Sequence, residues 1–539
     1  MKPALKNLSV LALAPFAVSL AQAATVTGTV KGPEGAAFRG AFIQAQNAAT
    51  KITVSVLSDK DGRYRIENLP AGQYQLQIRA PGFRAEPRSG MTLTAAQNLA
   101  QAFSLQKDMV RWNDLSQYQG TKLFPDIQGN QVLKGKDILA GRCFACHGFQ
   151  TRMASFKRDA DGWRDRVNYM RGAMHFFLDS AQPFTDDDAD NVTSYINLLF
   201  GENSVLPPSP ADMPAYKNLV RNFPEEAMKI VYVEYELPGK NRMPWSAVPD
   251  KDGNFWMPYY GTANRIGKLD PKSGVVQEFR VPNTDTAAIH SAVPAADGSV
   301  WLTEQGGNRL GRWDPATKTI SEFKDSYIKG KEGVTAGGQK HTVRVDAQGR
   351  VWSTGTPLAV FDPKTKTYTH IDEVPRVYGL ALDKDGNCWF AENIPNGQIG
   401  KVDAKTLKVQ KWAPPTKDGR PRRINIGPDG MVWFAEFNAG NLGRFDPKTE
   451  TFKEFPLPGP GPEATPYALG VDKNGTVWYS SEHLDVVGNL DPKTGRVIEY
   501  PFPQSENTMR EFFSDAQGRM WFGSPANNKV GYFYLAGAN

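Results

Sequence analysis

Cysteine is scarce in this chain, with three residues among 539. Disulfide-dependent secreted domains carry many more, and two of the three lie in one short motif, so we expect no disulfide. Long apolar runs are also missing, because the stretch from Leu8 to Leu20 is too short to span a bilayer and no later stretch comes close. The formal net charge is only +6, with both signs interspersed, which excludes a nucleic-acid footprint and favours acidic partners.

The first residues have the pattern of a secretory signal. Lys2 and Lys6 precede the apolar run, and Ala21-Gln22-Ala23 follows it as a small-residue cleavage site. We therefore predict a signal peptide over residues 1–23 and a mature chain that begins near Ala24 and lies outside the cytoplasm.

The motif Cys143-Phe144-Ala145-Cys146-His147 is the attachment signature of c-type haem. Two thiols at this spacing add to the two vinyl groups of one porphyrin, and the adjoining imidazole reaches the iron. A zinc site would need further thiolate or imidazole ligands nearby, whereas Cys388 lies far away in the sequence. We predict one covalent haem c held by Cys143, Cys146 and His147. On an exported chain, this points to a bacterial periplasm.

Residues 107–221, which contain the motif, have the sequence pattern of a helical domain. The sequence predicts helices over Leu133–Arg142, Ala160–Phe177 and Asp186–Phe200, the last opened by acidic residues that suit a helix N-terminus. This size and order are typical of a single-haem, α-helical cytochrome c domain.

The second axial ligand of the haem iron should be a thioether or another imidazole. The segment Trp163–Gly172 resembles the "W…V..M..G" segment of several small cytochromes, and this resemblance implies Met170 as the distal ligand. Met174, His175 and Met153 remain alternatives. Packing in a hydrophobic core is the competing interpretation for each methionine.

Residues 24–105 show short alternating strands separated by Gly, Pro and Asp. The stretch "DGRYRIENLPAGQYQLQIRAPGF" resembles the carboxypeptidase regulatory-like domain. The resemblance implies a prealbumin-like β-sandwich, a fold sometimes grouped with carbohydrate-binding modules. No residue here has a catalytic pattern, so we expect a spacer or docking module.

Residues 229–539 contain a repeat of about 45 residues, which is the sequence mark of a propeller. An Asp-Gly-x-x-Trp motif or a near variant recurs with tryptophans at 256, 301, 352, 389, 433, 478 and 521. Seven tryptophans predict seven four-stranded blades. Val231–Pro238 matches the outer strands of the repeats and should complete the last blade. Cys388 occupies an apolar repeat position and should be buried.

One repeat position predicts a ring of side chains at the propeller axis, because the innermost strands line the central channel. The residues eleven positions before the tryptophans are Trp245, His290, His341, Tyr378, Arg422, Tyr467 and Arg510. Such polar and aromatic variety favours a binding site for a small polar molecule. A second layer of side chains follows the tryptophans and comprises Tyr259, Glu304, Glu392, Glu436 and Glu482. These side chains could hold a metal ion near the axis. Idle, hydrated channel residues are the alternative.

The repeat "DG..WF.E…N.IG..D" resembles the virginiamycin B lyase (streptogramin lyase) family over about residues 230 to 535. The resemblance implies β-elimination with a histidine base and glutamates that hold magnesium. In this chain Thr465 replaces a metal-binding glutamate, Tyr467 replaces the base, and Arg422 replaces a substrate-contacting histidine. Glu482 alone is placed to match a metal ligand. Because tyrosine ordinarily titrates near pH 10, the family mechanism is not expected.

We therefore expect a multidomain protein in which a sandwich, a cytochrome c domain and a propeller follow one another. The first hypothesis is an oxidoreductase that oxidises a small polar organic substrate at His290, His341, Tyr378, Arg422 and Tyr467. Its haem would pass electrons to a soluble cytochrome or an oxidase. The alternatives are an electron-transfer or docking protein without catalysis of its own, and a lyase with a rebuilt site.

Overall fold

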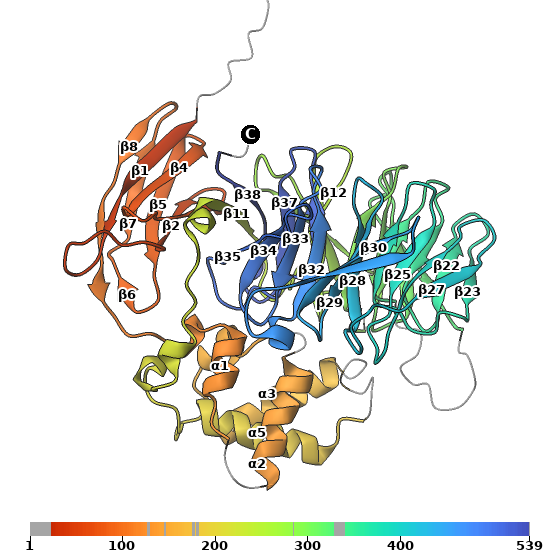
Figure 1. The fold of residues 1–539 in the computed structure, drawn as a ribbon, viewed down its shortest axis with the longest axis horizontal. Coiled ribbons are helices and arrows are strands. Elements are labelled where there is room, and N and C mark those ends of the chain that lie inside the picture. The colour runs from red at the N-terminus through yellow and green to blue at the C-terminus, as the bar shows by residue number, and fades with distance from the viewer. Residues whose placement is uncertain are drawn as a thin grey trace, which may run out of the picture.

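The fold is that of a computed structural model, which describes residues 23–126, 130–144, 147–174, 178, 183–283, 285–327 and 340–537. A β-sandwich, a helical segment and a ring of small sheets follow one another along the chain (Figure 1). None of the described helices is long and apolar enough to cross a membrane.

The N-terminal part is a sandwich, as predicted. One sheet has the order β4-β1-β8, with β9 also paired to β1, and the other contains β3-β2-β5-β7. The strands are β1 (Ala24–Lys31), β2 (Phe42–Asn47), β3 (Ile52–Leu57), β4 (Arg63–Leu69), β5 (Gly72–Arg79), β6 (Phe83–Arg84), β7 (Arg88–Leu93), β8 (Asn98–Ala100), β9 (Phe103–Ser104) and β10 (Gln106–Lys107). Alternate residues such as Val26, Ile66 and Leu76 are fully buried between the sheets.

The helical segment contains the three predicted helices, the third with the predicted ends and the first two with shifted ends. They are α2 (Asn130–Ile138), α3 (Ala160–Ala173) and α5 (Asp186–Phe200), joined by α1 (Gln117–Leu123) and short turns. Side chains of Ser116, Asp159 and Thr185 accept backbone N–H groups at the starts of α1, α3 and α5. Phe124, Phe149 and Phe200 form an aromatic cluster in the core. The helices alone do not make this segment a cytochrome, and that interpretation stays a prediction.

Six four-stranded antiparallel sheets follow within the described part of residues 248–501. They are β12–β15 (Val248–Pro249, Phe255–Pro258, Arg265–Leu269, Val276–Arg280), β16–β19 (Ile289–Pro294, Val300–Glu304, Arg309–Trp313, Ile320–Lys324), β20–β23 (Val343–Val345, Val351–Ser353, Leu358–Asp362, Thr367–Ile371), β24–β27 (Gly379–Leu382, Cys388–Ala391, Ile399–Val402, Val409–Trp412), β28–β31 (Pro421–Ile426, Val432–Glu436, Asn441–Asp446, Thr451–Pro456) and β32–β35 (Pro466–Val471, Val477–Ser481, Val486–Leu490, Val497–Pro501).

The repeated tryptophan anchors a turn in most blades. Trp256 Nε1 donates to Asp250 Oδ2 over 3.1 Å, and the same bond joins Trp389 to Asp383 and Trp521 to Asp515. The aspartate stands six residues before the tryptophan, where its other oxygen accepts backbone N–H groups of the turn. This bond explains a second recurring aspartate, which stands two residues before the aspartate of the Asp-Gly-x-x-Trp motif. Cys388 is fully buried in the same layer, as predicted.

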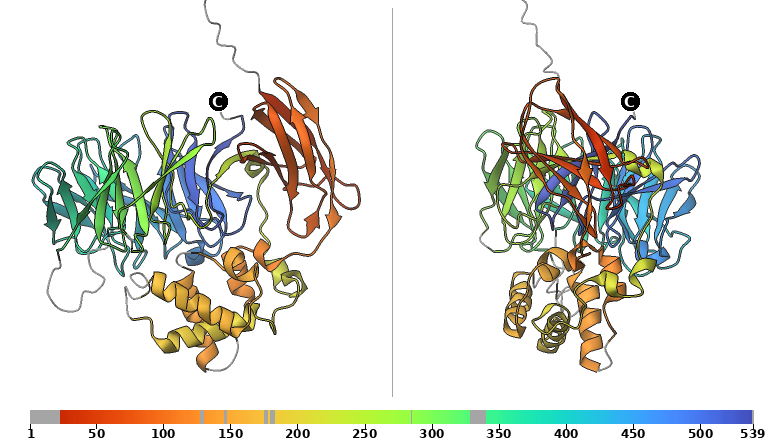
Figure 2. Two further views of the ribbon diagram at one scale, coloured as in Figure 1. Left: turned by 180° about the vertical axis from the view of Figure 1, so that it is seen from behind. Right: turned by 90° about the vertical axis from the view of Figure 1, so that its left-hand side faces the viewer.

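The seventh blade confirms the predicted closure of the ring. Strands β36 (Phe513–Ser514), β37 (Met520–Ser524) and β38 (Lys529–Leu535) pair with β11 (Ile230–Glu236), in which Tyr232 lies opposite Phe533. The other edge of β11 pairs with β3 of the sandwich, in which Val54 lies opposite Val233. One eight-stranded sheet therefore runs from the propeller into the sandwich, a continuity that the sequence did not reveal (Figures 1 and 2).

Candidate functional site

The helical segment lies against one face of the propeller (Figure 2). Tyr118 N donates to His483 O over 2.8 Å. Thr151 N and Oγ1 both donate to Glu506 Oε2, over 2.7 and 2.8 Å. Because Glu506 is only 2% exposed, these bonds form a dry attachment between the two parts.

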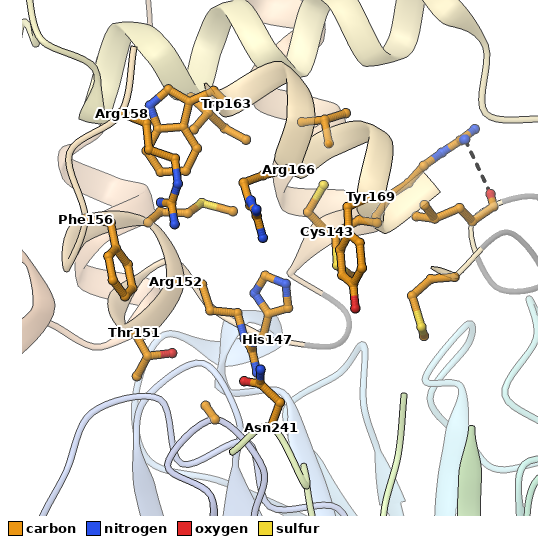
Figure 3. Close-up of a pocket in the computed structure, with 18 of the residues that line it drawn as sticks. Cys143, His147, Thr151, Arg152, Phe156, Arg158, Trp163, Arg166, Tyr169 and Asn241 are labelled. Carbon is orange, nitrogen blue, oxygen red and sulfur yellow. Dashed lines mark hydrogen bonds between the residues drawn. The ribbon is translucent and has the colours of Figure 1, made fainter. Parts of the chain in front are cut away.

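A cavity of about 380 Å³ lies at this junction and contains the motif histidine. Cys143 and His147 form part of its wall, and Asn241 and Ala526 close it from the propeller side. Figure 3 shows the His147 ring projecting into the cavity between Arg152 and Tyr169. Cys146 lies outside the described residues. The structure thus brings Cys143 and His147 to one cavity.

His147 has the tautomer and charge of a metal ligand. Its Nδ1 lies 2.8 Å from Gly148 O, and because a carbonyl only accepts, Nδ1 must donate. Burial, with help from the nearby Arg152 and Arg510, lowers the pKa of this imidazole to about 4. The neutral ring therefore keeps a lone pair on Nε2 for a metal ion.

The methionines proposed as distal ligands also line this cavity. Met170 lies on α3 and is half-buried, whereas Met153 and Met174 are buried. His175 lies outside the described residues. Met174 packs with Trp245, Tyr260 and Ala288 of the propeller, so the cavity wall and the propeller axis share one apolar cluster.

The cavity wall is apolar and cationic. Arg142, Arg152, Arg158 and Arg166 line it, and no carboxylate belongs to its described wall. The buried donors Arg152 Nε, Arg158 Nη1 and Trp163 Nε1 have no hydrogen-bond partner among the described residues. A flat apolar group with two carboxylates would satisfy such a wall. These observations fit a haem with its propionates.

The predicted ring forms a continuous cluster at the propeller axis. The rings of His290 and His341 have centroids 3.3 Å apart, and His341 lies 4.2 Å from Tyr378. Arg422 Nη2 donates to the hydroxyl oxygens of Tyr378 and Tyr467, over 3.1 and 3.0 Å. The structure therefore brings together the ring residues that the sequence singled out on the innermost strands.

This ring reaches the cavity through two aromatic side chains. Trp245 stacks on Tyr260 with centroids 4.3 Å apart, and each lies 5.8 Å from His290. Both belong to the apolar cluster that contains Met174. Packed side chains therefore connect the cavity wall with the axis.

Electrostatics divides the ring into neutral and charged members. Burial and the surrounding arginines hold the pKa values of His290 and His341 well below their usual range. Arg510 Nη1 pairs with Glu482 Oε1 at 2.5 Å, and both side chains are buried. Glu482 is thus occupied by a cation. Among the described residues, no group of three or more His, Cys, Asp or Glu side chains is placed to hold a metal ion.

The rest of the predicted second layer does not face the axis. Glu392 binds Lys411 Nζ at 2.7 Å, and Glu436 accepts from Asn441 at 3.1 Å, both within their own blades. Glu436 ends the second strand of its blade and Glu392 directly follows one, and each bonds to a later strand of the same blade. Glu482 follows its tryptophan by four residues and lies beyond β33, where it reaches the ring.

Two further arginines near the ring were not predicted from the sequence. Arg423 is 3% exposed, and its Nη1 donates to Thr342 Oγ1 and Glu511 Oε1 over 3.1 Å each. Arg344 Nη2 donates to the same Glu511 oxygen over 3.0 Å. The available signal was the pair of charged residues in Arg422-Arg423 on β28 and in Arg510-Glu511 before β36.

Comparison with known proteins establishes the fold at both ends of the chain. The model of the carboxypeptidase regulatory-like domain matches residues 25–106, and that of the virginiamycin B lyase family matches residues 364–538. The structure of a streptogramin B lyase has 24% sequence identity and a TM-score of 0.51, covering 58% of this chain and all of that one. Virginiamycin B lyase from Staphylococcus aureus has 21% identity and a TM-score of 0.51, covering 57% of this chain and 99% of that one.

A curated relative matches a smaller part of the chain. Strictosidine synthase from Catharanthus roseus is 22% identical over 189 residues, which are 32% of this chain and 50% of that protein. The chain thus spans about half the length of this relative. The comparisons define a multidomain protein with a β-propeller. More particularly, its sandwich is of the carboxypeptidase regulatory-like kind and its propeller is streptogramin lyase-like.

Proposed function

We propose that the chain is a periplasmic haem c protein in which a propeller-axis site exchanges electrons with one covalently bound haem. Cys143, Cys146 and His147 would hold the haem, and Met170 is the residue that the sequence favours as a further ligand. The bound haem iron supplies a one-electron acceptor. A soluble cytochrome or an oxidase takes the electrons onward.

The apolar cluster that joins the two sites is the main support for this proposal. Met174 of the cavity wall packs with Trp245 and Tyr260, which in turn contact His290. Arg510 of the ring is close enough to His147 to lower the pKa of that imidazole. Two sites that were unrelated in function would have no need to share their walls.

The residues of the ring do not suit the streptogramin lyase reaction. Burial keeps the pKa of Tyr467, at the position of the base, above its usual range. Glu482 is paired with Arg510, and Thr465 has no charge to offer a cation. These features disfavour metal-assisted elimination at this site.

An electron-transfer protein without its own substrate is the second candidate. Trp245, His290, Tyr467 and Arg510 are each at most 3% exposed, so much of the ring is closed to solvent. In that case the propeller would serve only to dock a partner.

The test begins with covalent haem. The exported protein, made in a host that attaches haem c, should gain the mass of one haem and a c-type visible spectrum. Cys143→Ala and Cys146→Ala should each weaken or abolish attachment, whereas Cys388→Ala should keep it. Absence of haem from the wild-type protein would refute the proposal.

The second step separates the two candidates. Small organic substrates are added without oxygen while the visible spectrum is recorded. Reduction of the haem that is lost in His290→Ala and His341→Ala, with the haem spectrum unchanged, places oxidation at the axis. Haem that accepts electrons only from a chemical reductant or another cytochrome favours the electron-transfer candidate.

A further inference from the structure

We propose that Tyr378 and Tyr467 share a single hydroxyl proton beside Arg422, and that Tyr378 is the proton acceptor for a phenolic ligand at the propeller axis. The ligand class rests on the proposed function of the axis as a binding site. The shared proton does not depend on the haem.

Hydrogen-bond counting carries the first step. The two hydroxyl oxygens contact each other, and each also accepts from Arg422 Nη2. Arginine has donors only, so it cannot take a proton from either hydroxyl. If both tyrosines are neutral, one proton lies between the oxygens, and the other finds no acceptor in Arg422, which bonds to both oxygens. Removing one proton satisfies the whole group.

Charge counting leads to the same conclusion. Arg510 pairs with Glu482, and Arg423 pairs with Glu511. Arg422 has no carboxylate partner among the described residues, and its guanidinium stacks on Tyr378, Tyr467 and Phe437 with Cζ 4.6, 3.9 and 4.2 Å from the ring centroids. Arg422 is half-buried, and a cation there without a directly bonded counter-ion carries a cost. A tyrosinate beside it removes that cost.

The asymmetry between the two rings selects Tyr378. Burial opposes ionisation of both, but Arg422, Arg423 and Arg510 together hold the pKa of Tyr378 below its usual range, whereas the pKa of Tyr467 is raised. Tyr378 is half-buried, and Tyr467 is 2% exposed. The remaining titratable neighbour, His341, has its pKa well below its usual range and adds no charge. Tyr378 is thus both the ionised member and the more accessible one.

The chemistry of the acceptor defines the ligand. A proton moves readily only between groups of similar acidity. Phenols match tyrosine, which ordinarily titrates near pH 10, whereas aliphatic alcohols are far weaker acids. In the proposed step, the phenol O–H bond breaks and an O–H bond forms on Tyr378. The phenolate then replaces the tyrosinate as counter-ion of Arg422, so the charge of the site is conserved.

The ionisation is measured by NMR on chemically reduced full-length protein that carries tyrosine labelled with carbon-13 at the ζ carbon. At pH 7, one resonance should lie at the tyrosinate position. It should vanish in Tyr378→Phe and persist in Tyr216→Phe, which alters a tyrosine of the helical segment that lines neither cavity. In Arg422→Met it should move to the phenol position. A wild-type spectrum with every tyrosine neutral at pH 7 would overturn the proposal, whether or not the variants fold.

Proton transfer is tested with 4-fluorophenol, whose fluorine-19 resonance reports its ionisation. Binding to the wild-type protein should convert the probe to phenolate and return the Tyr378 signal to the phenol position in equal amounts. No binding, or binding as neutral phenol with Tyr378 still ionised, refutes the ligand class. If the protein shows the tyrosinate signal but carries no attached haem, the haem proposal fails and the proposal of an ionised Tyr378 stands.

Discussion

Breaking the ion pair between Arg510 and Glu482 should destabilise the propeller by about 3 kcal/mol or more. The side chains are 1% and 2% exposed, with Arg510 Nη1 2.5 Å from Glu482 Oε1. Removal of one partner leaves a buried charge without compensation, which costs about 3–5 kcal/mol. Arg510 also lies over Trp245 and Tyr467, with Cζ 5.0 and 4.4 Å from the ring centroids. Each such cation–π contact contributes about 0.5–2 kcal/mol.

A double-mutant cycle isolates the pair. Glu482→Gln should cost about 3 kcal/mol and Arg510→Met somewhat more, because the methionine also loses the aromatic contacts. The double variant should cost clearly less than the sum, because no charge remains unpaired. The assay is urea unfolding followed by near-ultraviolet circular dichroism of the propeller aromatics.

The control is the exposed pair of Arg496 and Glu226, whose side chains are 59% and 46% exposed. Arg496→Met and Glu226→Gln should leave the unfolding midpoint unchanged, because exposed pairs contribute little. If each single change at Arg510 and Glu482 cost less than about 1 kcal/mol, or if their effects were additive, the account of a buried compensated pair would be wrong.

Two further predictions concern other buried carboxyl groups. Burial raises the pKa of Glu436 to about 8 from an ordinary value of 4.5, so the unfolded state binds fewer protons between these values and stability should fall as the pH rises through this window. Glu436→Gln should therefore gain stability relative to wild type between pH 5 and pH 8, and a constant difference across that range would contradict the assignment. Glu506→Ala leaves the two donors of Thr151 unsatisfied, so limited proteolysis of the helical segment should become faster. The control Glu202→Ala, on the exposed surface of the same segment, should not change the rate of proteolysis. Equal rates for the two variants would show that Glu506 does not hold the two parts together.

The propeller was predictable because its repeats encode local chemistry. An aspartate and a tryptophan six residues apart make a bond within one turn, so the pattern recurs wherever the turn recurs. The closing strand β11 was recognisable for a similar reason, since its sequence resembles the outer strands of the other blades. The pairing of β11 with β3 was not recognisable. The sequence "ITVSVL" predicts a strand but does not show which other strand it pairs with.

The site was predictable as a set of residues but not as a set of contacts. Equivalent positions on innermost strands must meet at the axis, which placed His290, His341 and Tyr378 together. The pairing of charges depends instead on side-chain length and direction. Arg423 follows the ring position by one residue and reaches Glu511 from a different blade. No spacing in the sequence shows such a contact.

The position of the helical segment leaves the opposite end of the channel as the route to Tyr378. A cavity of about 290 Å³ lies further along the innermost strands, with Arg344, Arg423 and Glu511 among apolar side chains of six blades. Arg423 connects this cavity to the ring, because its Cζ lies 5.1 Å from the centroid of Tyr378. A phenol has the size and the mixed polarity that this cavity accommodates.

Leu380→Trp should fill that cavity and block entry. Leu380 lies on β24, two residues after Tyr378, and contributes to the cavity wall. We expect 4-fluorophenol binding to be lost while the haem spectrum and the tyrosinate signal stay as in wild type. The matched change Leu382→Ala, two residues further along the same wall, should enlarge the entrance and preserve binding. Unimpaired binding to Leu380→Trp would place the entrance at the helical face instead, and the ligand would then have to pass the haem cavity to reach Tyr378.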